Sequence, residues 1–380
     1  MRDRGRRLAR ERRLALACRS GRDVLSRPAS EATIVRIVYG VQSTGKGHLS
    51  RFLGLKPLFV RDGHELLVLV TGPDEPPRYF YDALQDVPHH RFQGLSMIED
   101  GAGGISRGGT VKAFAGDLPE LFESFWRAHN IISAFEPDLI VSDFDPITGS
   151  PFVAPGTRKI GIGNAATLSH PAAARPPKAK MDRFNVNVIR KLHTSGLDVE
   201  LGCHFYPLDA SCLPPILRPE VLAQPTRNLG HLVVYHAFRG LLQPILDYAA
   251  RHPERAIVVY GSEARPADAP ENLRFQEDAD RFVEDLASCD AYVGTAGFQT
   301  ISEAFFFAKK IVVRPIAAQY EQLWNAEQME HHGMGRRYRG DLDGDLQQTV
   351  DPNLHERLAA WYRSGASLCY ERILAHAAPD

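Results

Sequence analysis

One stretch of the chain, Asp290–Ala326, alternates short apolar runs with helical patterns, and it constrains the fold more than any other stretch. Its pattern predicts a strand that ends at Gly294, a turn over 295–297, a helix that begins at Phe298, a second strand that ends at Pro315, and a second helix. Strands that alternate with helices in this way form parallel sheets with helices on both faces. The stretch therefore predicts an α/β fold.

The turn before the first of these helices is a candidate anion site. Gly297 lets backbone groups approach a ligand closely, and the unpaired N–H groups and the dipole of the helix favour a phosphate or diphosphate at its start. The alternative is an ordinary turn between a strand and a helix, which binds nothing.

The same helix carries a second candidate group. One of its sides has the spacing of a core-facing stripe, formed by Ile301, Ala304, Phe305 and Ala308. Glu303 is expected on the opposite, outward side, flanked by Thr300 and Phe307. A carboxylate there can accept hydrogen bonds from both hydroxyls of a ribose, and the alternative is a plain solvent-facing glutamate.

Three runs in this part of the chain, GTAGFQTISEA, KKIVVRPI and QYEQLWNA, resemble the donor site of nucleotide-sugar glycosyltransferases of the GT-B fold. They are most similar to the bacterial branch that contains the peptidoglycan N-acetylglucosaminyltransferase and the macrolide and UDP-glucuronosyl type enzymes. The resemblance covers about residues 33–335. It implies two doubly wound Rossmann-like domains that face each other across a cleft, with a C-terminal helix that crosses back to the first domain.

The resemblance also implies which residues bind a nucleotide-diphospho-sugar donor, with a UDP-sugar favoured. Gly297 would hold the diphosphate, Glu303 the ribose, and Glu321 with Gln322 the sugar hydroxyls. Further donor contacts are expected from Phe298, Thr300, Asn325 and His236. Many family members have a histidine where this chain has Thr295, so the backbone contact to the phosphate is expected and a side-chain contact stays open.

A second glycine-rich loop follows the first predicted strand, Thr33–Tyr39. The string GVQSTGKG nearly satisfies the phosphate-loop pattern of nucleoside triphosphatases, but Gly47 replaces the hydroxyl that binds magnesium. In the glycosyltransferase interpretation, Gly45 and Gly47 give backbone room for the acceptor and the phosphates. His48 then stands where family members often place a catalytic base, and a structural histidine that bonds its own loop is the alternative.

Another strand of the first half, predicted over Leu139–Ser142, brings Asp143 and Asp145 to the carboxyl edge of the first sheet, where α/β sheets bind ligands. Either carboxylate could orient His48, and Asp145 could instead cap a helix or form a turn before a proline. The glycine-rich run 101–109 is expected to form a flexible loop on the acceptor side.

The chain is expected to have two domains and a hinge. Four prolines between Leu213 and Gly230 have the composition of a linker. The predicted parts are a basic extension over 1–30, an acceptor-binding domain over 31–213, a linker over 214–230, a nucleotide-sugar domain over 231–352, and a C-terminal segment over 353–380 with one helix from Asn353 to Leu374.

Composition narrows the class of protein. A chain of 380 residues with a formal net charge of −1 and no run of 18 apolar residues indicates a soluble globular protein that binds no nucleic acid. Its five cysteines are scattered and include no C-x-x-C pair, which favours a reducing, cytoplasmic location.

The first 30 residues carry ten arginines. They fit a disordered extension, a basic amphipathic helix on anionic lipid, or a targeting peptide, so peripheral contact with the inner face of a membrane is a further expectation.

The expected reaction is transfer of a sugar to a hydroxyl acceptor, which could be a glycan, a lipid-linked molecule or a small molecule. From the family we expect inversion by single displacement and no cofactor. We also expect no metal, because no Asp-x-Asp motif is placed to hold a divalent ion against a diphosphate. Two other functions fit the same fold: a hydrolysing nucleotide-sugar 2-epimerase, and a nucleotide-sugar or glycan-binding protein without catalytic activity.

Overall fold

The structure is a computed structural model that describes residues 33–94, 107–176, 180–235, 239–261, 265–317, 319–347 and 351–377. Side chains at 107–118, 180–182, 184, 185 and 239 fall outside this description. Val35–Asp380 form one compact unit. The basic extension over 1–30 lies outside the described residues.

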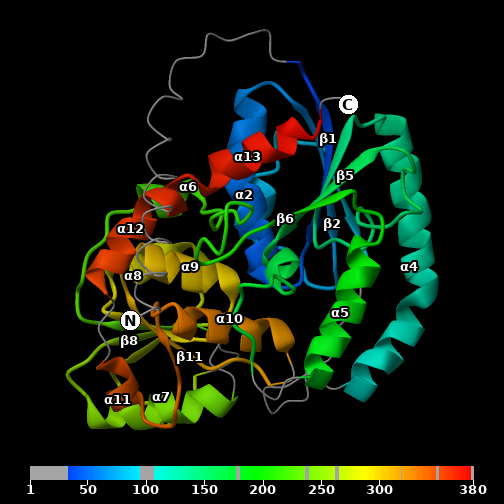
Figure 1. Cartoon of the computed structure of the whole chain (residues 1–380). Coiled ribbons are helices and arrows are strands. Elements are labelled where there is room, and N and C mark those ends of the chain that lie inside the picture. Colours follow the sequence, from blue (N-terminus) through cyan, green and yellow to red (C-terminus); the bar gives the residue numbers. More distant parts are fainter. Residues whose placement is uncertain are drawn as a thin grey trace. The chain divides into compact units, whose positions relative to one another are not determined.

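The first half of the unit is built on a parallel six-stranded sheet with the order β3-β2-β1-β4-β5-β6 (Figure 1). Its strands are β1 (Arg36–Gln42), β2 (Glu65–Thr71), β3 (His89–Phe92), β4 (Leu139–Asp143), β5 (Arg158–Gly163) and β6 (Val199–Gly202). The central strands are nearly continuous apolar runs, because both faces of the sheet are covered. Tyr39 and Val41 pack with α2, whereas Val38 packs on the other face with α4.

The second half repeats this arrangement with the order β12-β11-β10-β7-β8-β9, again all parallel. Its strands are β7 (Leu232–Tyr235), β8 (Ile257–Tyr260), β9 (Leu273–Gln276), β10 (Ala291–Gly294), β11 (Lys310–Val313) and β12 (Arg336–Arg337). Both sheets have the strand order of doubly wound nucleotide-binding folds, in which ligands bind at the carboxyl ends beside the strand where the order reverses. The predicted fold class is confirmed.

Helices connect these strands and cover the sheets. In the first half they are α2 (Lys46–Arg61), α3 (Arg78–Asp82), α4 (Arg107–Phe135), the short 3-10 turn η2 (Asn164–Thr167) and α5 (Lys180–Thr194). In the second half they are α6 (Pro219–Ala223), α7 (Arg239–Arg251), η3 (Ala279–Arg281), α8 (Phe282–Ser288), α9 (Phe298–Phe306), α10 (Tyr320–His331), α11 (Leu342–Leu346), α12 (Pro352–Arg363) and α13 (Gly365–Ala375). Among the described helices, none is long and apolar enough to cross a membrane.

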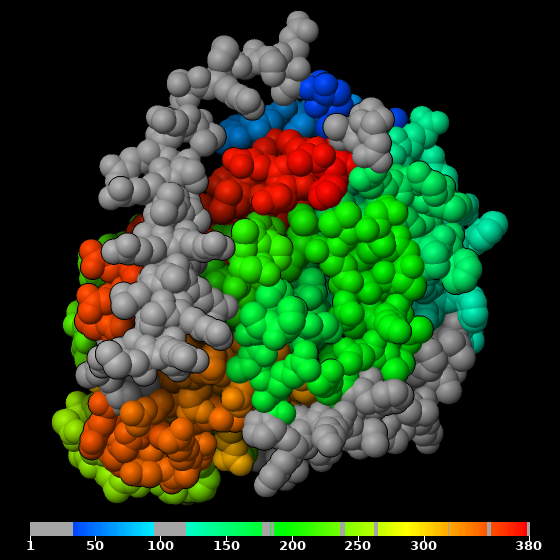
Figure 2. Space-filling view, viewed as in Figure 1, coloured from blue at the N-terminus to red at the C-terminus, as the bar shows by residue number. Residues whose placement is uncertain are grey.

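The last two helices join the halves. Helix α12 packs on α9, and α13 packs on α2, as Figure 1 shows. In Figure 2 the red surface of α13 adjoins blue surface from the start of the folded chain. The hydroxyl of Tyr370 in α13 donates a hydrogen bond to Asp62 (2.6 Å), lies 3.0 Å from Nε2 of His64, and its ring packs against Phe59. The predicted return of the C-terminal helix to the first half is confirmed.

Three predicted elements differ from the structure. The single helix expected over 353–374 is broken at Ser364. Gly365, the next residue, packs so closely against the carbonyl of Pro215 that a Cβ atom would stand only 2.0 Å from its oxygen. The expected linker contains α6, which begins with Pro219 at its first turn, a position that proline favours. Residues 107–109 of the flexible loop expected over 101–109 belong instead to α4, and residues 101–106 lie outside the described residues. The domain boundaries stay predictions.

The first predicted strand is displaced along the chain. It was expected over 33–39, and β1 instead runs from Arg36 to Gln42, paired with β2 along its whole length. Gly40 therefore lies inside the strand. The side chains of Asp145 and Thr148 pack against it and leave no space for a Cβ atom, which explains why this position is a glycine.

Candidate active site

A large cavity of about 1430 Å³ lies where the carboxyl ends of the two sheets meet. Most of the predicted site residues line it: Gly45, Gly47, His48, Gly297, Phe298, Thr300, Glu303, Glu321 and Gln322. Asp143 and Asn325 lie behind the cavity wall, and His236 lies outside the described residues. The cavity therefore brings groups from both halves of the chain to one place.

His48 and Asp143 form a directly bonded pair on the first-sheet side. His48 lies in the first turn of α2, and Asp143 is the last residue of β4, the strand that neighbours β1. The Nδ1 atom of His48 lies 2.7 Å from Oδ1 of Asp143, whose side chain has 0% exposure. The carboxylate can only accept, so Nδ1 carries the proton in this bond and Nε2 is left as a proton acceptor. Nη2 of Arg51 also lies 3.1 Å from this Nδ1, but it is a donor too and bonds Asp143 instead.

A buried arginine completes this cluster, and the sequence analysis missed it. Arg51 donates from Nε to Oδ2 of Asp143 (2.7 Å) and from Nη2 to Oδ1 (2.8 Å), which makes a two-pronged ion pair. It lies one helical turn beyond His48, so the i, i+3 spacing on α2 is a signal that could have found it. The three side chains act as one unit.

Electrostatics keep the carboxylate ionised in this buried place. Burial alone would raise the pKa of Asp143, but the positive charge of Arg51 and the contact with His48 hold the pKa below its ordinary value. For Arg51, burial acts to lower the pKa and Asp143 more than offsets it, so the pKa is raised. Asp143 is therefore a fixed negative charge behind the imidazole.

The backbone turns sharply after this carboxylate. Phe144 adopts a positive φ of 56°, which is a strained conformation for a bulky side chain. Its ring lies parallel to the ring of His48, with a 10° interplanar angle and 6.2 Å between centroids. His193 meets the other side of Phe144 at 4.5 Å, and burial lowers the pKa of His193 to about 4, so this ring is neutral near pH 7. Phe144 thus limits the space in which the His48 ring can move.

Asp145, the other carboxylate expected to be able to orient His48, has a different place. Its Oδ2 atom accepts hydrogen bonds from the backbone N–H of Thr148 (2.9 Å) and from the Thr148 hydroxyl (2.5 Å). Burial raises the pKa of Asp145. Asp145 holds its own turn, as the structural alternative predicted, and Asp143 is the residue that bonds His48.

In the second half of the chain, α9 begins immediately after Gly297, as predicted. A Cβ atom at this glycine would meet nothing closer than the Thr300 hydroxyl at 4.0 Å, so it would project into open space in front of the helix start. The glycine therefore leaves the first N–H groups of α9 accessible to a ligand.

Glu303 differs from the expectation of an outward-facing residue. Its side chain is only 2% exposed, and its Oε1 atom accepts a hydrogen bond from Gln299 (3.0 Å). Phe307, expected on the outer side as well, has 0% exposure and belongs to the core. The reason is that α9 is covered on several sides at once, by α2, α10, α12 and β11. Glu303 still lines the cavity from this buried position.

Glu321 and Gln322, at the start of α10, form hydrogen bonds with residues of both halves. Glu321 accepts a hydrogen bond from the side-chain amide of Asn164 (3.0 Å), the first residue of η2, directly after β5 in the first half. The side-chain oxygen of Gln322 accepts from the backbone N–H groups of Ala296 (3.1 Å) and Ile316 (3.0 Å). Asn325 is fully buried and donates to the carbonyl of Ala296 (2.9 Å). Gln322 and Asn325 thus hold the turn before α9 in shape.

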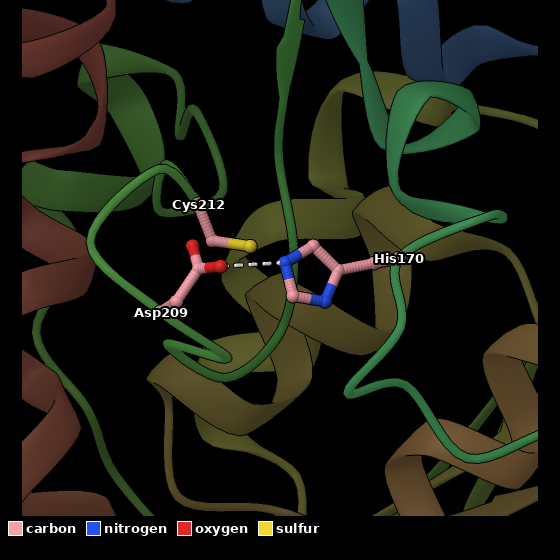
Figure 3. Close-up of side chains that lie close together, drawn as sticks. All are labelled: His170, Asp209 and Cys212. Carbon is pink, nitrogen blue, oxygen red and sulfur yellow. Dashed lines mark hydrogen bonds and ion pairs between the residues drawn. The ribbon is translucent and has the colours of Figure 1, made fainter.

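One group of potential metal ligands lies away from this cavity. The ring of His170, the carboxylate of Asp209 and the sulfur of Cys212 face one another in Figure 3, with ligand atoms within 4.8 Å. Nδ1 of His170 accepts the backbone N–H of Ala172 (3.2 Å), so the proton is on Nε2 and is donated to Asp209 (2.8 Å). In this tautomer Nε2 cannot bind a metal, and the group serves as a hydrogen-bonded link between two loops.

Comparison with known proteins matches most of the chain to one family. The family model described as Glycosyl transferase family 1 matches residues 35–351. The match covers both sheets and every residue of the cavity described above.

Among curated proteins, a similar relative is the UDP-N-acetylglucosamine--N-acetylmuramyl-(pentapeptide) pyrophosphoryl-undecaprenol N-acetylglucosamine transferase of Desulfitobacterium hafniense. It is 25% identical over 249 residues, which span 56% of this chain and 63% of the relative. The aligned region is thus shorter than two thirds of that protein.

Solved structures with similar folds include a glycotransferase of kitacinnamycin and UGT2 of Phytolacca americana complexed with UDP-2fluoro-glucose and pterostilbene. The first has a TM-score of 0.61 and 16% identity, covering 91% of this chain and 100% of the other. The second has a TM-score of 0.58 and 12% identity, covering 90% and 98%. At these identities the likeness establishes the fold.

Proposed function

Because the chain belongs to glycosyl transferase family 1, we propose that it transfers a sugar from a nucleotide-diphospho-sugar to a hydroxyl acceptor. One observation carries this proposal: the same cavity is lined by His48, which bonds the buried Asp143, and by the start of α9 with Glu303. A proton acceptor and an anion-binding helix start in one cavity are the two parts that such a transfer needs.

The reaction would proceed as a single displacement. The acceptor oxygen attacks the anomeric carbon while its proton passes to Nε2 of His48. The bond from that carbon to the diphosphate oxygen breaks, and its electron pair leaves with the nucleoside diphosphate. Asp143 keeps its bond to Nδ1–H and stabilises the imidazolium that forms. Attack opposite to the leaving group inverts the anomeric configuration.

The second half would bind the donor through groups on the cavity wall. The free N–H groups after Gly297 would hold the diphosphate, since a helix start favours anions. Glu303, with Thr300 beside the same opening, would accept hydrogen bonds from the ribose. Glu321 and Gln322 would contact the sugar hydroxyls, and Phe298 would form the floor of the site.

A UDP-sugar is the favoured donor. The name of the bacterial relative and the bound ligand of the plant structure both contain UDP. These two proteins act on or hold very different second molecules, a lipid-linked pyrophosphate and pterostilbene, so the acceptor class is proposed only as a hydroxyl compound. No cofactor beyond the donor and no metal are part of the proposal.

We place the protein in the cytoplasm, with peripheral contact to a membrane. Support comes from the cysteines at 203, 212, 289 and 369, which are all free and buried. Helix α5 exposes Val188, Ile189 and Leu192 along with basic residues, a composition that suits a lipid surface.

The test is a thermal-shift panel of nucleotides followed by a transfer assay. A nucleotide at about 100 times its dissociation constant should stabilise the protein by about 2.7 kcal/mol. With a UDP-sugar, a transferase needs an acceptor to form product, a 2-epimerase converts the donor without one, and a binding protein does neither. A protein whose melting temperature responds to no nucleotide would exclude the proposed function.

A further inference from the structure

The lysine of the incomplete phosphate-loop string has no part in the mechanism above. Lys46 follows Gly45 directly and opens α2, and it is accessible from the cavity. Arg218 lines the same cavity from the segment that joins the two sheets. These two cations come from parts of the sequence far apart, and the fold brings them to the same wall.

Arg218 is held in position, yet its Nε–H donates no hydrogen bond among the described residues. Its side chain is 13% exposed, and its guanidinium lies 5.9 Å from the ring centroid of Tyr79. Its Nε atom lies 3.8 Å from Oε1 of Glu303, beyond hydrogen-bond distance. Within the described part of the chain this buried Nε–H finds no acceptor. An unpaired buried donor is costly, so a ligand acceptor at this point would be favourable.

The two cations also act on each other. Partial exclusion of water by the cavity walls lowers the pKa of Lys46, and the nearby charge of Arg218 lowers it further. Like charges that face one cavity repel, and an anion between them would remove that repulsion.

Two helix starts meet at the same place. A Cβ atom on Gly47, in the first turn of α2, would lie 3.5 Å from Cβ of Gln299 in the first turn of α9. Helix α2 has 16 residues and α9 has 9, so both present free N–H groups and a positive dipole end. The cavity wall here combines two helix starts with two side-chain cations.

We propose that Lys46 and Arg218 hold the diphosphate of the nucleotide donor between the starts of α2 and α9. The inference rests on the proposed function and adds two residues to it. The phosphate bound here is assigned to the donor rather than to an acceptor because Arg218 lies beside Glu303. Glu303 belongs to α9, the helix that would hold the nucleotide. The two cations would supply side-chain contacts to the phosphate where many family members have a histidine and this chain has Thr295, and would stabilise the leaving diphosphate as the glycosidic bond breaks.

Calorimetric titration with UDP and with uridine tests the assignment. Lys46→Met and Arg218→Met should each weaken UDP binding about tenfold to a hundredfold, because each removes a charge-assisted contact. Uridine lacks the diphosphate, so its affinity should not change in Lys46→Met; in Arg218→Met, which also removes the ion pair with Glu303, uridine should lose less affinity than UDP does. Lys46→Arg should restore most of the UDP affinity. Lys191→Met and Arg357→Met change the same residue types at exposed positions outside the cavity and should bind as the wild type does.

Three results would overturn the assignment. The first is unchanged UDP affinity in both variants, and the second is an equal loss for UDP and uridine, which would indicate general damage to the site. The third is unchanged UDP affinity with a higher KM for the acceptor, which would assign the cations to an acceptor phosphate. A wild-type protein that binds no nucleoside diphosphate would refute the proposed function as well, whereas equal binding by wild type and variants refutes this inference alone.

Discussion

Replacing Asp143 by asparagine would remove one negative charge from the buried cluster with His48 and Arg51 and leave the side chain almost the same size. Asp143 accepts three hydrogen bonds from these two partners, at 2.7, 2.7 and 2.8 Å. An asparagine has a single oxygen, so its NH₂ group must face a donor of one partner. The variant therefore tests both the ion pair and the orientation of the imidazole.

The cost to folding follows from burial. Arg51 and Asp143 are both almost completely buried, and the substitution leaves the guanidinium without a counter-ion. Removing one partner of a buried pair costs about 3 to 5 kcal/mol, a large part of the roughly 5 to 15 kcal/mol by which most proteins are stable. Turnover should also fall, although less than in His48→Ala, because the base itself remains.

The dependence on pH has a definite sign. The folded-state pKa of Asp143 lies below its ordinary value, so its contribution to stability is present above about pH 4. That contribution is lost as the pH falls through the lowered folded-state pKa. Urea unfolding of the wild type should show this loss on acidification, and Asp143→Asn should lack it.

Asp145→Asn is the matched control. Asp145 has the same 0% exposure at the same sheet edge, but its bonds come from neutral donors of Thr148. Loss of its charge should cost only about 1 kcal/mol. Urea unfolding at pH 7, with UDP release as the activity assay, compares the two variants. Equal destabilisation by both substitutions, or an Asp143→Asn protein within 1 kcal/mol of the wild type, would refute this reasoning.

Three further predictions concern the reaction. His48→Ala should lower turnover by about 10² to 10⁴ with little change in UDP affinity, and near-normal turnover in a coupled UDP-release assay would remove His48 as the base. Glu303→Ala should weaken UDP binding roughly tenfold to a hundredfold, measured by calorimetry; an unchanged dissociation constant would remove Glu303 from the ribose site. EDTA should leave the transfer rate unchanged, whereas activity abolished by EDTA and restored by manganese or magnesium would show that the reaction needs a metal.

The sequence predicted the parts of the site that depend on a single element. A glycine turn followed by a helix, and a strand that ends in a carboxylate, are local patterns, and the structure has them at Gly297 and Asp143. The partnership of His48 with Asp143 rather than Asp145 depends on the backbone turn at Phe144, and no residue pattern specifies that turn.

The errors come from packing on more than one side. The orientation of Glu303 was predicted from one apolar stripe, which assumes that the other side of the helix faces water. Helix α9 has neighbours on several sides, so the assumption does not hold. Likewise, Gly365, directly after the break at Ser364, packs against Pro215, a residue about 150 positions earlier. The periodicity of apolar residues along a sequence does not reveal such contacts between distant residues.

The contact between α13 and α2 has a consequence for synthesis. Tyr370 bonds Asp62 across 308 positions of sequence, so α2 leaves the ribosome long before its covering helix exists. Chains are synthesised at about 5 to 20 residues per second, so the apolar face around Phe59 stays uncovered for roughly 15 to 60 s before α13 has been made. During that interval the nascent first half is a candidate client for chaperones. Chains stalled on the ribosome before α13 should therefore be cut by protease more readily at α2 than released chains.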